Sequence, residues 1–198
     1  MSNYSEYIGI DEVARGNLFG PLIFVGSKLK NVKIDLDYVM DSKLTTKSQR
    51  NSLYKKIIND VDYVIIETTP QDIDCFGLSH CIHRSLKEIK DYFGNDIKYL
   101  YDGNNSFGVD SIETMVKADL YVPTVSASSI IAKSYLDRLM EKYDKRFPKY
   151  GLIDNAGYGT KKHIESILEY GYTDLHRKSY KVKKIEEVKS KQLSSILF

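Results

Sequence analysis

The sequence predicts an α/β fold in which a mixed sheet is flanked by helices. Two short apolar runs, residues 7–10 and 22–25, stand on either side of a glycine-containing turn, and this pattern indicates a hairpin-like pair of strands. Farther along the chain, apolar runs alternate with segments of helical periodicity, as expected for helices packed on a sheet. The chain therefore opens with a hairpin and continues with strand and helix in turn.

The individual elements follow from periodicity. A helix begins at Thr45 or Thr46 and carries a basic face. The β-branched residues 61–69 predict a strand, and the helix after it has Leu78, Ile82, Leu86, Ile89 and Phe93 on one side. We expect further strands at residues 99–101 and 119–122. A helix capped by Ser126 then has an inner face that includes Ala127, Ile130, Ile131 and Leu139.

Composition sets wider limits. The 198 residues are 42% hydrophobic and 28% charged, which fits one globular domain, and a net charge of +2 does not by itself identify a nucleic-acid-binding protein. Cys75 and Cys81 match no metal-ligand or disulfide spacing, so reduced thiols are expected. With no signal peptide or bilayer-spanning run, we expect a soluble cytoplasmic protein without a membrane partner.

Four acidic residues stand at or beside predicted strand ends: Asp11, Glu12, Asp102 and Asp119. Carboxylates gathered in this way can share divalent cations, because hard cations such as Mg²⁺ take oxygen ligands. Each acid alone has an ordinary explanation, and Asp102 before Gly103 is common turn chemistry. Adjacent strand residues also point to opposite faces, so Asp11 and Glu12 serve one site only if the chain leaves the pleat there.

Six segments in order resemble ribonuclease HII, from about residue 7 to residue 180. The first is Gly9-Ile10-Asp11-Glu12-Val13-Ala14-Arg15-Gly16 with Phe19-Gly20-Pro21. The others are Asp41-Ser42-Lys43-Leu44, Tyr101-Asp102-Gly103-Asn104, Lys117-Ala118-Asp119 with the stretch from Ser126 to Arg138, Gly157-Tyr158-Gly159-Thr160, and His176-Arg177-Lys178-Ser179. Val13 and Phe19 also resemble the related ribonuclease HIII pattern, whereas Arg15 favours HII.

The resemblance implies a ribonuclease H-like fold, a five-stranded mixed sheet flanked by helices with a small C-terminal helical part. It assigns residues 1–180 to the catalytic domain and leaves 181–198 as a basic helix or tail. It also implies that Asp11, Glu12, Asp102 and Asp119 are the catalytic, metal-binding acids, and that they hold two Mg²⁺ or Mn²⁺ ions. The expected reaction is endonucleolytic hydrolysis of RNA in RNA–DNA hybrids, leaving 5′-phosphate and 3′-hydroxyl ends, with incision also at ribonucleotides embedded in duplex DNA.

The same resemblance implies the substrate contacts. The turn Ala14-Arg15-Gly16 would meet the 2′-hydroxyl through its backbone, and Tyr158 would pack against the neighbouring sugar. Lys43 and Arg177 would contact the phosphate backbone. Ala14 stands where the family has glycine, so positive φ there costs energy, whereas negative φ makes the alanine harmless.

Alternatives remain at this stage. A junction resolvase or similar nuclease would share clustered acids, and a non-catalytic hybrid-binding protein would share the substrate surface. The segment from Ser190 to Phe198 loosely resembles peptides that bind a sliding clamp, although a tail helix packed against the domain is favoured. We expect a monomer.

Overall fold

A five-stranded mixed sheet forms the centre of the computed structural model, which describes residues 6–31, 39 and 46–196. Its strands are β1 (Ile8–Val13), β2 (Leu22–Leu29), β3 (Val61–Thr68), β4 (Tyr99–Asp102) and β5 (Ile112–Met115). Their order across the sheet is β3-β2-β1-β4-β5. Because β1 pairs antiparallel with β2 and parallel with β4, it occupies the centre, and the predicted mixed sheet is confirmed.

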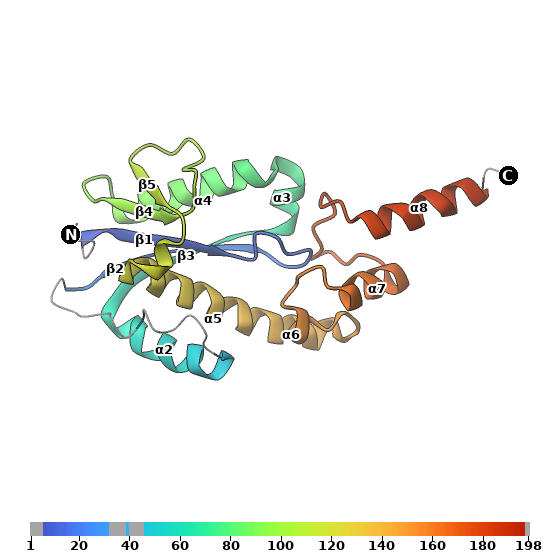
Figure 1. The fold of residues 1–198 in the computed structure, drawn as a ribbon, viewed down its shortest axis with the longest axis horizontal. Coiled ribbons are helices and arrows are strands. Elements are labelled where there is room, and N and C mark those ends of the chain that lie inside the picture. Colours follow the sequence, from blue (N-terminus) through green and yellow to red (C-terminus); the bar gives the residue numbers. More distant parts are fainter. Residues whose placement is uncertain (1–5, 32–38, 40–45, 197–198) are drawn as a thin grey trace.

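Helices cover both faces of this sheet (Figure 1). On one face lie α3 (Pro70–Phe76) and α4 (Leu78–Phe93), and on the other lie α2 (Lys47–Asp60) and the long α5 (Pro123–Arg146). Alternate strand residues feed two separate apolar layers: Phe24 packs toward Ile82 of α4, whereas Val25 packs toward α5. The fold therefore has three layers with two cores.

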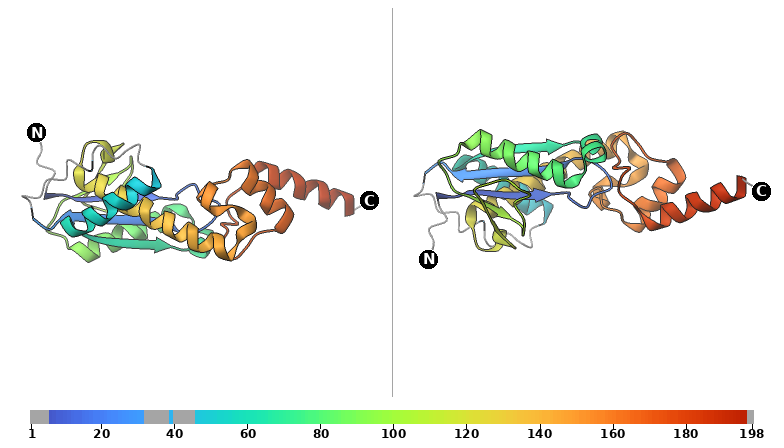
Figure 2. Two further views of the ribbon diagram at one scale, coloured as in Figure 1. Left: turned by 90° about the horizontal axis from the view of Figure 1, so that it is seen from below. Right: turned by 90° about the horizontal axis from the view of Figure 1, so that it is seen from above.

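Four further helical segments gather beyond one end of the sheet, as Figure 2 shows from two further sides. They are η4 (Pro148–Tyr150), α6 (Leu152–Asn155), α7 (Lys161–Tyr170) and α8 (Lys183–Ile196). Ile185 at the start of α8 is buried in the same core cluster as α5 residues. In the part of the chain that the structure describes, no helix has the length and apolar character to cross a bilayer.

The start of α5 lies directly against β1 at Gly9. A Cβ at Gly9 would stand 2.3 Å from the carbonyl carbon of Thr124 and from the amide nitrogen of Val125. Ser128 of α5 donates a hydrogen bond of 2.7 Å to the Gly9 carbonyl. Only glycine permits this approach, which places the first turns of α5 beside the N-terminal half of β1.

Two expectations from the sequence were wrong. Residues 119–122 form no strand: Ala118–Leu120 is the short 3-10 helix η3, and the fifth strand is Ile112–Met115. The apolar character of that stretch reflects Ala118 and Val122, which are buried against Val125 of α5. The following helix begins at Pro123 rather than after Ser126, since proline has no amide hydrogen to lose in the first turn.

Candidate active site

The parallel pairing of β1 and β4 brings Asp11 and Asp102 to one face. Gly9 pairs with Leu100 and Ile10 with Tyr101, so the next step along both strands sets Asp11 beside Asp102. Leu100, which points to the same side as Asp102, packs against Val125 of α5. These two acids therefore face the N-terminal part of α5.

Asp119 joins this pair from η3. Its backbone amide donates to Asp102 Oδ2 at 3.4 Å. The residue before η3, Lys117, has φ 60°, which turns the chain back toward the end of β4. Three of the four predicted acids thus gather at the α5 face.

Glu12 lies on the opposite face of β1. The register with β2 stays regular through Val13, and Glu12 pairs with Phe24, which belongs to the α4 layer. The departure from the pleat that would unite Asp11 and Glu12 therefore comes only after both residues. Consistent with this, the described residues contain no group of three or more acidic, histidine or cysteine side chains poised to hold a metal ion.

Burial and mutual repulsion shape the carboxyl groups. Burial raises the pKa of Asp11 to about 8, opposed by the Ser129 hydroxyl and reinforced by the charge of Glu12. Burial also raises the pKa of Glu12, against the nearby cation of Arg15. For Asp102, burial and the charge of Asp119 raise the pKa. These acids have less positive charge around them than their ionised forms require.

One carboxylate group is only partly compensated by its neighbours. Glu12 Oε2 and the Tyr101 hydroxyl are both buried without a hydrogen bond of normal geometry, although the hydroxyl acts against burial to lower the pKa of Glu12, and Oε1 lies 3.6 Å from Arg15 Nη1. A buried, unpaired anionic oxygen is costly unless a cation meets it. Together with the all-oxygen donor set, this atom fits a hard divalent ion.

The turn after β1 has the strained backbone that one of the sequence alternatives required. Ala14 has φ 68° and is 2% exposed, and its carbonyl accepts the Asn17 amide at 3.2 Å. The Arg15 guanidinium lies 5.5 Å from the centre of the Phe107 ring. Alanine is thus held where glycine is favoured.

Arg177 holds this turn from beneath. It is fully buried, and its Nη1 donates to the Arg15 carbonyl at 3.0 Å while its Nε donates to the Gly20 carbonyl at 3.0 Å. The Tyr180 hydroxyl donates to the same Arg15 carbonyl at 2.8 Å. In this arrangement the Arg177 guanidinium meets the protein backbone, not solvent.

Tyr158 lies beside the turn, on a loop attached to it. Its side chain is 47% exposed. The Gly157 carbonyl accepts the amides of Leu18 at 2.8 Å and Phe19 at 3.2 Å. The sequence-predicted turn and tyrosine, more than 140 residues apart, are therefore brought together.

Two buried histidines fix the other side of this loop. The Thr173 amide donates to His176 Nδ1 at 2.9 Å, so His176 carries its proton on Nε2 and faces His163 Nε2 at 3.2 Å. His163 Nδ1 then donates to the Tyr158 carbonyl at 2.8 Å. Burial lowers the pKa of both rings, and for His176 to about 3 with repulsion from His163 contributing.

Lys43 and Lys133 are two lysines of the resembling segments. Lys43 lies outside the described residues. Lys133 of α5 donates a hydrogen bond to Ser129 at 2.8 Å, and Asp137, one turn farther along the helix, binds Arg50 at 2.6 Å. Lys133 also lowers the pKa of Asp11, although less than Ser129 does.

Sequence reasoning missed the supporting residues. Ser129 was read only as part of a motif, and Tyr180 was not noticed. The one signal for both was position, since Ser129 lies in the stretch after Asp119 and Tyr180 follows His176-Arg177-Lys178-Ser179 directly. No local sequence pattern predicts that the Tyr180 hydroxyl binds the Arg15 carbonyl, 165 residues away.

A mixed sheet in this order, with acids at the ends of its central strands, defines the nucleases of the ribonuclease H-like fold. The structure described as ribonuclease H2 from Pyrococcus horikoshii OT3 superposes with a TM-score of 0.71 at 27% identity, covering 91% of this chain and 97% of that one. The complex of PCNA with RNase HII from Archaeoglobus fulgidus gives 0.74 at 22% identity, covering 90% and 96%, which shows a shared fold.

Sequence comparison is more specific. The family profile described as Ribonuclease HII matches residues 8–183. A Ribonuclease HII from Sulfurovum sp. (strain NBC37-1) is 42% identical over 179 residues, which is 90% of this chain and 93% of that protein. The chain belongs to the ribonuclease HII family, metal-dependent endoribonucleases that cleave RNA in RNA–DNA hybrids. The family resemblance, the fold and the reaction class expected from the sequence are confirmed.

Proposed function

We propose that this chain, beyond cutting RNA in hybrids, incises at single ribonucleotides embedded in duplex DNA. Asp11, Glu12, Asp102 and Asp119 would hold two divalent ions, Mg²⁺ or Mn²⁺. Water attack on the phosphodiester would leave 5′-phosphate and 3′-hydroxyl ends. The observation that carries the metal assignment is the buried Glu12 Oε2 near the end of β1, which has no hydrogen bond of normal geometry while burial and the charge of Asp102 raise the pKa of Glu12.

The bound ions would supply a nucleophile at neutral pH and offset charge on the phosphate oxygens. The chain's own groups have complementary roles. Asp11 and Asp102 face α5 side by side, and the backbone amide of Asp119 orients the Asp102 carboxylate. Because Glu12 starts on the other face, it would reach the site around the end of the strand, where the regular pairing stops after Val13.

The ribonucleotide would be recognised by the turn of Ala14, Arg15 and Gly16 together with Tyr158. Support comes from their proximity and from the exposure of Tyr158. In this proposal Arg177 acts by positioning the turn, because its side chain is fully buried and its Nε and Nη1 donate to backbone carbonyls. Lys43 remains the predicted phosphate contact.

The test is cleavage of three duplexes in Mg²⁺ and in Mn²⁺: one with a single ribonucleotide, one continuous hybrid and one four-way junction. We expect the first two to be cut and the junction to stay intact. Asp11→Asn and Asp102→Asn should abolish cleavage while retaining hybrid binding. A single ribonucleotide left uncut in both metals would overturn the proposal, and metal-independent cleavage would overturn the assignment of the acids.

A sliding clamp is a second partner to test. The Archaeoglobus fulgidus structure is described as a complex with PCNA, and the C-terminal segment of this chain loosely resembles a clamp-binding peptide. Deletion of residues 193–198 should then abolish binding to the host's clamp without changing cleavage of a short hybrid. Equal clamp binding by the full and shortened chains would refute this role of the segment.

A further inference from the structure

The middle carbonyl of the turn, that of Arg15, accepts hydrogen bonds from two donors of the C-terminal segment. Arg177 Nη1 lies 3.0 Å from it and the Tyr180 hydroxyl 2.8 Å. The two donors also bind each other, since Nη1 donates to the Tyr180 oxygen at 3.2 Å. A carbonyl oxygen has two lone pairs, so this one is fully used by the protein.

Arg177 is a charged side chain that lies buried beneath the turn. Its side chain is fully buried, and in the described part of the chain it has no ion pair with a carboxylate. A buried cation is costly unless hydrogen bonds replace its lost hydration, and the carbonyls of Arg15 and Gly20 do so for Nη1 and Nε, whereas Nη2 is buried without a partner among the described residues. The backbone of the turn is therefore held by a buried side chain whose donors point at its carbonyl groups.

The position of the Arg15 carbonyl also determines the direction of the Gly16 amide. The Arg15 carbonyl and the Gly16 N–H belong to one planar trans peptide unit, so they point in opposite directions. With the carbonyl directed inward at Arg177 and Tyr180, the Gly16 N–H points away from them. Gly16 is exposed, a Cβ there would meet nothing within 4 Å, and its amide has no protein partner among the described residues.

We propose that Tyr180 and Arg177 are positioning residues that lock the Arg15–Gly16 peptide plane and thereby present the Gly16 amide as a donor to the ribose. This inference rests on the proposed function of the turn. It adds a specificity role for the segment after His176, and for the Tyr180 hydroxyl in particular. Loosening the plane would leave the metal-binding acids in place but misdirect the donor.

The test compares Tyr180→Phe with Tyr92→Phe. Tyr180→Phe removes the hydroxyl with its contacts to the Arg15 carbonyl and to Arg177, and it leaves the hydrogen bond from Arg177 to the Arg15 carbonyl, so we expect the fold to be retained. Tyr92→Phe makes the same chemical change at a side chain 61% exposed on α4. We expect the Gly16 amide resonance of Tyr180→Phe to shift and its hydrogen exchange to accelerate. We also expect kcat/KM for a single embedded ribonucleotide to fall about 3- to 10-fold, mainly through kcat, the value of roughly one hydrogen bond.

An unchanged Gly16 amide in Tyr180→Phe would overturn the inference, as would a loss of kcat/KM no larger than that of Tyr92→Phe. The proposed function fails separately, if the unmodified enzyme cuts the hybrid and leaves the single ribonucleotide intact. In that case only the Gly16 amide resonance of Tyr180→Phe tests the inference. A shifted resonance supports the locked peptide plane, and an unshifted one refutes it.

Discussion

At the scale of single residues, Ala14 carries a conformational cost. Its φ of 68° is disfavoured for an L-residue by about 1 kcal/mol or more, yet its methyl group is buried in the core cluster of the α5 layer. Ala14→Gly removes the cost of the left-handed backbone but also loses the buried methyl group, so we expect a small change in Tm. We expect cleavage at a single ribonucleotide to rise about two- to fivefold relative to a continuous hybrid, measured as kcat/KM on both substrates.

Ser111→Gly is the matched control for Ala14→Gly. Ser111 also has a left-handed backbone, with φ 61°, but it is exposed and precedes β5. It should relieve similar strain without altering substrate preference. Equal relative rates for the unmodified chain and Ala14→Gly on the two substrates would refute a link between this residue and the lone ribonucleotide.

The sequence predicts the acids of the site better than it predicts the backbone of the turn. Asp11 and Asp102 were found because carboxylates at strand ends are a local pattern, and period-two alternation already warned that Glu12 would face the other way. The sign of φ at Ala14 was left open, since alanine is allowed in both regions. The burial of Arg177 was not foreseeable, because its partner Arg15 is 162 residues distant.

At the scale of elements, the His163–His176 contact joins α7 to the loop before α8. Both rings must be neutral for Nε2–H of one to meet the lone pair of the other. The folded pKa of His176 is depressed to about 3 from 6.5, so its stabilising effect is present above pH 6.5 and is lost as pH falls toward 3. We expect stability to drop between pH 7 and pH 4 by on the order of 2 kcal/mol through this residue.

The comparison for this pH effect is His176→Gln, measured by urea unfolding at several pH values. Its pH dependence should be shallower than that of the unmodified chain, although it is less stable at pH 7. His80→Gln removes an exposed histidine of α4 and should leave the slope unchanged. Parallel curves for the unmodified chain and His176→Gln would show that the ring stays neutral or charged in both states alike.

Element prediction succeeded where periodicity was long and failed where elements were short. The helix α4 has 16 residues with one clear apolar face, and its position was predicted well. The strand β5 has four residues at the sheet edge, two of them exposed in its centre, so no alternation marked it. The run before Pro123 has the apolar residues expected of a strand, but in the structure Ala118 of η3 and Val122 after it are buried against Val125 of α5.

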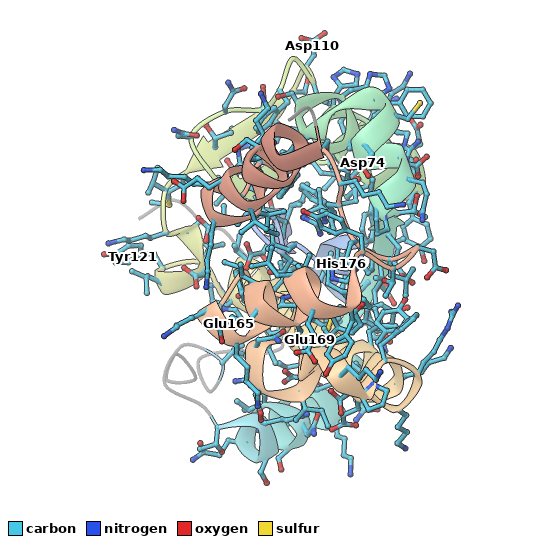
Figure 3. All side chains as sticks on the ribbon, turned by 90° about the vertical axis from the view of Figure 1, so that its right-hand side faces the viewer. Asp74, Asp110, Tyr121, Glu165, Glu169 and His176 are labelled. Carbon is cyan, nitrogen blue, oxygen red and sulfur yellow. The ribbon has the colours of Figure 1, made fainter. Side chains whose placement is uncertain are left out.

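At the scale of the whole molecule, the C-terminal part shares an apolar core with the sheet body and is also joined to it by polar contacts. Figure 3 looks onto that end and shows His176 near its centre, with Asp74 of α3 above it. Phe19 forms a β-bridge with His176, so the segment after β1 and the segment before α8 share backbone pairing. The family resemblance predicted a small C-terminal helical part, but no local pattern indicated which side chains would attach it.

Asp74 accepts three of the polar contacts. Its carboxylate accepts the Lys178 amide at 2.9 Å, the Ser179 amide at 2.9 Å and the Ser179 hydroxyl at 2.6 Å. Burial acts to raise the pKa of Asp74, but these hydrogen bonds outweigh it and lower the pKa, so the charged form is the bound one. The two residues that it binds stand directly between Arg177 and Tyr180, which hold the turn.

Asp74→Ala should therefore affect both stability and the site. We expect a loss of about 1–3 kcal/mol in the free energy of unfolding, because two backbone amides and a hydroxyl lose a charged acceptor. Hydrogen exchange of the Lys178 and Ser179 amides should accelerate, and cleavage of a single ribonucleotide should fall with it. Asp110→Ala, at an exposed aspartate at the top of the same view, is the control. If Asp74→Ala exchanged these amides no faster than Asp110→Ala, the attachment of the C-terminal part would have to lie in its apolar contacts instead.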